Sequence, residues 1–256
     1  MTIMLNETTQ TVRLWETQRK TDSAPLSLPP KAYTDPGFLA LEVESLFRRQ
    51  WLCLGRVDEI PAPGDFFTLN LLDEPLLVVR GDDDGIRVLA NVCRHRNMIV
   101  ASGSGNARRF ACPYHAWSYH RDGTLDRAPN ATPDQLALLH HCRLECLRSE
   151  IWQGFIYVNL DGQASPLGPR LTALDLVLQR YHTDTMHQVF STQETWATNW
   201  KCLIENFMES YHLSTVHPQT LAHMTPTRLC EKLDGGRDWT GYRAHYPENF
   251  DTDVDN

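Results

Sequence analysis

Short runs of apolar residues, separated by turn residues, dominate the middle of the chain. The runs are rich in β-branched and aromatic residues, with Gly, Asp or Pro between them, and this pattern favours strands. They cover residues 64–72, 75–81, 86–93 and 152–160. The Asp-Gly pair in RDGTL, residues 121–125, is typical of a tight hairpin. The pattern therefore predicts a small antiparallel β domain.

Helical periodicity flanks this β region on both sides. Residues 34–51 offer Thr34 or Asp35 as a cap and carry Pro36 in the first turn, ahead of apolar residues at helical spacing. From residue 200 a second stripe follows the spacing i, i+3, i+4, i+7, i+8 and i+11, which predicts one continuous helix. The stripe consists of Trp200, Leu203, Ile204, Phe207, Met208 and Tyr211.

These elements predict an α+β chain in three parts. A polar arm and the first helix occupy residues 1–45, and the small β domain occupies residues 46–162. Residues 163–256 begin a further domain, which opens with the linker-like DGQASPLGP. A helix around 170–181 and a strand around 187–197 are expected to follow it.

Composition excludes several classes of protein. The net charge of −8 argues against nucleic-acid binding, because such proteins normally present a basic surface. No apolar run approaches the roughly 20 residues of a membrane-spanning helix, and the N-terminus lacks the apolar stretch of a secretory signal. We therefore expect a cytoplasmic globular protein. Seven cysteines are too sparse for a disulfide scaffold, although Cys142 and Cys146 have the spacing to share a helix face.

Two Cys/His pairs form the first candidate site. Cys93 and His95 are separated by one residue, sixteen residues follow, and Cys112 and His115 are separated by two. Two thiolates and two imidazoles bind either one tetrahedral zinc or the two irons of a [2Fe–2S] cluster. Each pair begins where a predicted strand ends, and the flanking PYHAW supplies aromatics to shield the sulfurs. These features favour the cluster, and zinc remains the alternative.

The predicted helix after residue 200 carries the second candidate site. Glu205, Glu209 and His212 fall on the face opposite the apolar stripe, where a solvated surface is the simpler interpretation. However, His217 follows five residues after His212, next to a proline that ends the helix. Two imidazoles and a carboxylate with open positions describe the facial triad of non-haem Fe(II) oxygenases.

The motif CRHR…CPYHAWSYHRDGTL resembles the cluster-binding signature of the Rieske non-haem iron oxygenases over roughly residues 50–160. Asn97 and Ala116 stand where that family usually has glycine. Asn tolerates a left-handed backbone better than most residues, and Ala is a small change. We therefore expect the two cluster loops to form.

The segment ENFMESYHLSTVH resembles the mononuclear-iron motif of the same family, with His212 and His217 at the ligand positions. By the resemblance, Glu209 is the bridging carboxylate, connecting His115 of one subunit to His212 of the next. Most members have Asp there, whereas members acting on carnitine, betaine and similar quaternary ammonium compounds tend to have Glu. Asn206 is expected to line the iron site.

The resemblance implies the oxygenase (α) component of a multicomponent enzyme. Its cofactors would be a [2Fe–2S] cluster and a mononuclear Fe(II), supplied with electrons from NAD(P)H by a separate reductase. With O2 it would hydroxylate or oxidatively dealkylate a small organic substrate, either a quaternary ammonium compound or an aromatic. A homotrimer and a helix-grip (START-like) catalytic domain are further expectations.

The sequence departs from the family in one respect. The third iron ligand is an Asp or Glu far downstream in the family, and only 39 residues follow His217. We therefore expect a C-terminally incomplete catalytic domain. Two other classes stay open: a Rieske ferredoxin-like electron carrier, and a zinc-stabilised binding module. The carrier leaves Glu209, His212 and His217 unexplained, and the zinc module also leaves PYHAW unexplained.

Overall fold

The computed structural model describes residues 9, 12–13, 16, 27–248 and 250. The polar arm predicted for residues 1–30 lies mostly outside the described residues. The chain divides into two compact units. Residues 42–169 and 178–191 form the first, which we call the β unit. Residues 170–177 and 192 onward, with the N-terminal residues up to 41, form the second, which we call the α7 unit.

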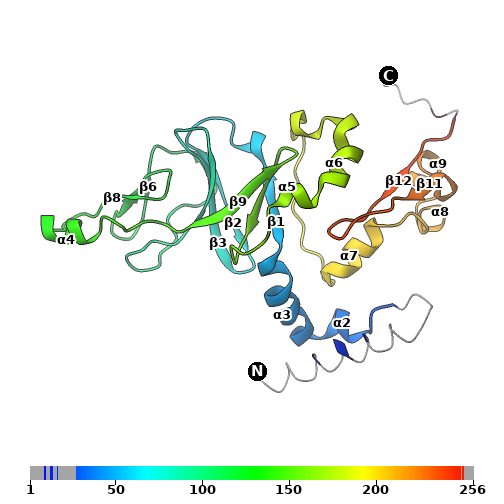
Figure 1. Cartoon of the computed structure of the whole chain (residues 1–256), viewed down its shortest axis with the longest axis horizontal. Helices are drawn as coiled ribbons and strands as arrows, with labels where there is room; N and C mark the ends of the chain where they lie inside the picture. The colour runs from blue at the N-terminus through cyan, green and yellow to red at the C-terminus, as the bar shows by residue number, and fades with distance from the viewer. Residues whose placement is uncertain (1–8, 10–11, 14–15, 17–26, 249, 251–256) are drawn as a thin grey trace. The chain divides into compact units, whose positions relative to one another are not determined.

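Two antiparallel sheets make up the β unit. The larger has seven strands in the order β1-β10-β9-β4-β3-β2-β5, and the smaller has the order β6-β7-β8. The large sheet consists of β1 (Trp51–Arg56), β2 (Asp65–Leu71), β3 (Glu74–Arg80), β4 (Ile86–Ala90), β5 (Ser104–Asn106), β9 (Cys146–Trp152) and β10 (Phe155–Asn159). The small sheet consists of β6 (Phe110–Ala111), β7 (Ser118–Tyr119) and β8 (Leu125–Arg127), and it lies with α4 (Pro133–Leu138) at one end of the unit (Figure 1).

The β unit buries two apolar clusters, one on each side of β3. Leu77 and Val79 belong to the first cluster, while Leu76 and Val78 belong to the second, as the two-residue period of a strand requires. The first cluster lies beneath the candidate metal ligands. It also contains Leu89, Cys93, Val100, Phe110, Cys112, Tyr119 and Leu144.

The strand predictions are confirmed for β2, β3 and β4, and RDGTL forms the turn between β7 and β8. There Gly123 has a φ of +87° and donates its N–H to the carbonyl of His120 at 2.9 Å. The run 152–160 is not one strand, because the turn at Gln153 and Gly154 separates β9 from β10. Cys142 and Cys146 have the spacing of a helix face but do not share one, because Cys146 begins β9.

Helices precede and follow the β strands. The predicted first helix is α3 (Pro36–Ser45), which follows the single turn α2 (Lys31–Thr34), and Asp35 accepts the N–H of Gly37 at 2.8 Å. The helix expected around residue 170 consists of α5 (Leu167–Arg170) and α6 (Thr172–Leu178). Every helix among the described residues is too short or too polar to cross a membrane.

After residue 186 the structure corrects two predictions. The continuous helix is wrong: α7 (Trp200–Phe207) ends early, and α8 (Leu213–Val216) and α9 (Leu221–Met224) follow, with the hairpin β11 (Cys230–Lys232) and β12 (Tyr242–Ala244). Its apolar stripe stays uncovered, since Phe207 is 65% and Tyr211 85% exposed. The strand predicted around 187–197 is also wrong, because that segment pairs with no described strand.

Candidate metal centres

The two loops that carry the Cys/His pairs share one backbone geometry. In each loop the cysteine N–H donates to the carbonyl five residues later, at 2.8 Å for both Cys93 and Cys112. Each cysteine carbonyl accepts the N–H four residues later, from Asn97 at 2.9 Å and from Ala116 at 3.0 Å. Asn97 and Ala116 have φ angles of +53° and +56°, in the left-handed region that favours glycine. Both loops therefore form without glycine, as the sequence predicts.

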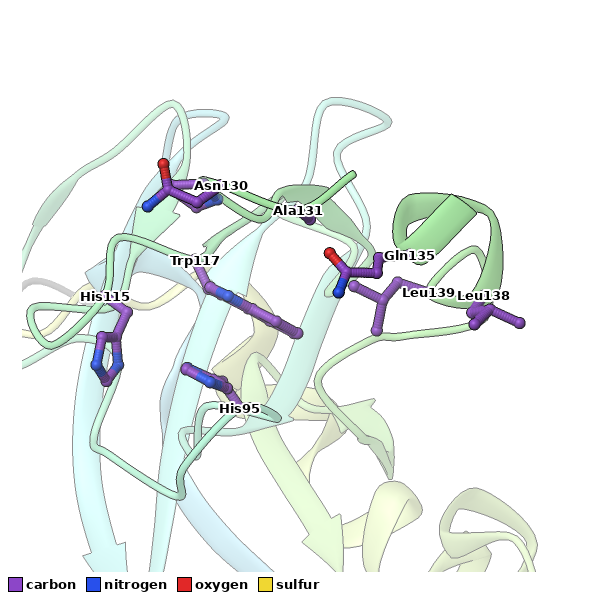
Figure 2. A pocket seen from close by; sticks show the side chains of 9 residues that line it. His95, His115, Trp117, Asn130, Ala131, Gln135, Leu138 and Leu139 are labelled. Atoms are coloured by element: carbon purple, nitrogen blue, oxygen red, sulfur yellow. The ribbon is translucent and has the colours of Figure 1, made fainter. Parts of the chain in front are cut away.

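The thiols and imidazoles lie in different environments. Cys93 and Cys112 are 1% and 4% exposed within the apolar core of the β unit, whereas His95 and His115 are exposed. The two imidazole rings lie close together in an edge-to-face arrangement, with centroids 4.7 Å apart and an interplanar angle of 68° (Figure 2). A Rieske cluster needs its thiols and its imidazoles on different sides, because the two cysteines bind one iron and the two histidines bind the other. The four residues therefore fit a [2Fe–2S] cluster.

Tyr119 adds a contact that the sequence analysis missed. Its hydroxyl lies 3.3 Å from the Cys93 sulfur and accepts the N–H of Arg94 at 3.0 Å. Burial raises the pKa of Tyr119, and the contact with Cys93 raises it further. The hydroxyl therefore keeps its proton and can donate it to a Cys93 thiolate. The only sequence signal was a tyrosine two residues after the PYHAW segment.

The imidazoles open on a hollow of about 610 Å³. The Trp117 ring stacks on His95, with centroids 4.9 Å apart and an interplanar angle of 7°. Partial desolvation lowers the pKa of His95, and the neighbouring His115 lowers it further. The opposite wall includes Leu138 and Leu139, at the end of the unpredicted helix α4 (Figure 2).

The second set of residues lies where α7 ends. The Glu209 carboxylate is hydrogen-bonded to Nδ1 of His212 and also accepts the backbone N–H of Tyr211. The second bond stabilises a new turn and explains why α7 stops before this point. The bond to His212 lowers the pKa of Glu209. Because Glu209 occupies Nδ1, the Nε2 atom of His212 is the one available to a metal.

His212 and His217 stand at the two ends of α8, so His217 lies at a helix end as predicted, whereas His212 is not inside a helix. His212 precedes the helix and His217 follows it, so the single turn brings their ring centroids to 5.6 Å. Asn206 is exposed in the last turn of α7 and forms no hydrogen bond with either histidine or with Glu209 in the described structure. The structure thus brings together three of these four predicted residues.

The described residues place no third ligand beside His212 and His217. In the described part of the chain, no three His, Cys, Asp or Glu side chains converge on one ion. Asp238 is paired with Arg170 at 2.5 Å, and this hydrogen bond lowers the pKa of Asp238. Three further acidic candidates lie outside the described residues: Asp251, Asp253 and Asp255. The two histidines fit two positions of a facial triad.

Two domain families match the sequence. Residues 50–148 match the Rieske [2Fe–2S] domain, and residues 174–252 match the catalytic domain of the ring hydroxylating alpha subunit. The chain therefore belongs to the Rieske non-haem iron oxygenase family, and it is homologous to the α subunits of these enzymes. In the family these two domains carry a [2Fe–2S] cluster and a mononuclear iron.

Individual relatives are similar over most of this chain. The glycine betaine monooxygenase oxygenase subunit of Chromohalobacter salexigens is 36% identical over 76% of the chain and 44% of that relative. The carnitine monooxygenase oxygenase subunit of Escherichia coli K12 is 30% identical over 84% of the chain and 58% of that relative. The chain therefore spans about half the length of these relatives. A crystal structure of the quaternary ammonium Rieske monooxygenase CntA has a TM-score of 0.79 and 27% identity, covering 87% of this chain and 62% of CntA.

Proposed function

We propose that the chain is the terminal oxygenase component of a multicomponent Rieske oxygenase. The cluster is held by the thiolates of Cys93 and Cys112 and the imidazoles of His95 and His115, while His212 and His217 hold Fe(II). One observation supports this most: both candidate sites occur in one chain, in the family's order. The first is the pair of cluster loops, with buried thiols and exposed imidazoles. The second is the pair His212 and His217, in which the Glu209 carboxylate orients His212. The metal centres supply the redox chemistry with O2, and an NAD(P)H-dependent reductase supplies the electrons.

In this proposal the protein's own residues orient the ligands and exclude water. The core beneath the cluster keeps Cys93 and Cys112 dry, while His95 and His115 stay at the surface. Glu209 fixes the orientation of the His212 ring through Nδ1. The same carboxylate would accept a hydrogen bond from His115 of a neighbouring subunit, which would require the head-to-tail trimer expected from the sequence.

For the substrate we favour a quaternary ammonium compound. Glu209 stands where most family members have Asp, and the two relatives above are named for glycine betaine and carnitine. Oxidation of such a substrate would hydroxylate it, and an alkyl group would then be lost from the nitrogen. An aromatic substrate is the second possibility, because the matching catalytic domain is that of ring hydroxylating subunits.

The alternative function is electron transfer alone. The observation favouring it is that, among the described residues, no third ligand converges with His212 and His217. A carrier of this kind would bind the cluster at Cys93, His95, Cys112 and His115 and bind no iron at His212 and His217.

Metal and sulfide analysis of anaerobically purified protein, with EPR after dithionite, separates these functions. An oxygenase is expected to show a Rieske-type signal and a third iron that is lost in His217→Ala but kept in the matched variant His223→Ala. Substrate-dependent O2 consumption with glycine betaine, carnitine or benzene then tests the substrate class. Two irons with no third would support the carrier, and zinc without sulfide would contradict both functions.

A further inference from the structure

Charge is unevenly distributed within the β unit. Residues 91–127, which carry the cluster loops, have six arginines and two aspartates, for a net charge of +4. Residues 50–90, which build much of the large sheet, have three arginines and eight acidic residues, for a net charge of −5. The cluster end is therefore positive in a chain whose net charge is −8.

A second hollow of about 710 Å³ lies at this positive end. We call it the arginine hollow, and its lining includes Arg94, His141 and Arg143 together with one carboxylate, that of Glu145. Arg94 and Arg143 are both exposed, and neither forms an ion pair with a described carboxylate. Among the described residues, the Arg143 side chain donates to the backbone carbonyl of Asp122 at 3.0 Å, and its charge helps to lower the pKa of the Asp122 carboxyl. Both guanidinium groups are exposed, and the hollow has two arginines against the one carboxylate of Glu145.

The arginine hollow lies on the sulfur side of the candidate cluster site. Arg94 directly follows Cys93, and its N–H donates to the Tyr119 hydroxyl, which contacts the Cys93 sulfur at 3.3 Å. The imidazoles open instead on the hollow beside Trp117. Leu138 lines both hollows, so the end of α4 stands between them. The cluster site can thus be approached from two separate sides.

We propose that the arginine hollow is the docking surface for the electron donor, a protein with an acidic surface and a low-potential one-electron centre. This inference rests on the proposed function, in which the imidazole side of the cluster contacts Glu209 of a neighbouring subunit through His115. In the transfer one electron leaves the reduced donor and reduces one ferric ion of the cluster to ferrous, and no bond forms or breaks. Two exposed arginines steer an acidic partner toward this surface, which lies beside Cys93.

The test measures the rate at which a reduced plant-type [2Fe–2S] ferredoxin reduces the cluster of the purified holoprotein in a stopped-flow instrument. Such ferredoxins have lower potentials than Rieske centres, so the transfer is downhill. Arg143→Glu is expected to lower the second-order rate constant by about fivefold at low ionic strength, and high salt should abolish most of the difference. Glu145→Gln should have the opposite effect and raise the rate.

Two matched charge reversals complete the experiment. Arg96→Glu places the same change at an exposed residue next to His95 in sequence, and Arg108→Glu places it in another exposed basic region of the β unit. Both should leave the rate within about twofold of wild type. A slower rate in either, with Arg143→Glu unchanged, would overturn the arginine hollow as the docking surface. The EPR signal of each variant confirms that its cluster is intact, and a wild-type protein without that signal would instead refute the proposed function.

Discussion

The cluster loops and the segment around Glu209 are both candidate metal sites, but they are built differently. The cluster loops rest on an apolar core, and their cysteines are almost fully buried. The segment around Glu209 consists of residues close together in sequence, held by a carboxylate that bonds its own neighbours. Beside it, Phe207 and Tyr211 leave large apolar side chains exposed.

This difference shows how much each site depends on the rest of the fold. The two cluster loops obtain all four ligands, their hydrogen bonds and their shielding within the β unit. His212 and His217 obtain their spacing from the single turn of α8 but lack a third ligand in the described structure. A cluster site of this kind is complete in one small unit, whereas the iron site is not.

The largest expected effect is loss of the cluster. Cys112→Ala removes a buried thiolate that the cluster requires, so iron and sulfide should both fall to background and the Rieske EPR signal should disappear. The matched variant Cys146→Ala removes an exposed thiol from the same unit and should retain the full signal. Retention of the signal by Cys112→Ala would show that the ligand set is wrong.

The next prediction compares a buried apolar side chain of the β unit with an exposed one beside Glu209. Leu144→Ala opens a cavity beneath the cluster loops and should cost about 3 kcal/mol of unfolding free energy, measured by urea denaturation. Phe207→Ser changes an exposed side chain and should shift stability by less than about 0.5 kcal/mol. An equal loss in both variants would mean that Phe207 is covered by another chain in solution.

The residue with a left-handed backbone in each cluster loop offers a test in which a substitution should increase stability. Ala116→Gly should raise the free energy of unfolding by about 1 kcal/mol, because the Cβ of alanine is strained at positive φ. Asn97→Gly should give a smaller gain, because Asn adopts this backbone more readily. Urea denaturation of both variants checks the difference, and a loss of stability in Ala116→Gly would contradict the assigned backbone geometry.

Tyr119 provides a redox test of the buried side of the cluster. Tyr119→Phe removes a hydrogen bond to the Cys93 sulfur that stabilises the more negative, reduced cluster. The reduction potential should therefore fall by on the order of 40 mV, equivalent to about 1 kcal/mol for one electron. Protein-film voltammetry measures the shift. An unchanged potential would show that the hydroxyl does not donate to the sulfur.

The smallest effect concerns acid stability. The backbone N–H of Gln188 donates to Asp58 at 2.8 Å, and this bond, with the side chain of Arg56, lowers the pKa of Asp58 from 3.8. A carboxylate with a depressed folded pKa stabilises the fold above its unfolded value, and the contribution disappears as pH falls through the folded value. Wild type should therefore exceed Asp58→Asn in stability at pH 6 by less than about 1 kcal/mol, and the gap should close at a pH well below 3.8. Thermal unfolding at both pH values measures the gap, and a constant difference would contradict this account.

Local signals in the sequence were sufficient for several features. The alternation of apolar residues identified β2, β3 and β4, and the Asp-Gly pair identified the turn before β8. The paired Cys/His spacing identified the residues that the two loops bring together, because the two members of each pair lie within one short loop. Asn97 and Ala116 were identified as positions where the loops need a left-handed backbone.

Other features were decided by contacts that the hydrophobic periodicity does not record. The periodicity after residue 200 is helical, yet α7 ends because the Glu209 carboxylate bonds backbone N–H groups that the helix would otherwise use. Residues 187–197 have a strand-like pattern, but a strand also needs a neighbour, and no described strand lies beside them.

The sequence by itself therefore determined the type of metal chemistry and the residues that cluster locally, because spacing and side-chain chemistry are local properties. Tertiary structure decided that Tyr119 reaches Cys93, that α4 separates two approaches to the cluster, and that Cys93 and Cys112 are dry while His95 and His115 are exposed. These features arise when strands far apart in the chain pack together, and no short stretch of sequence records that packing.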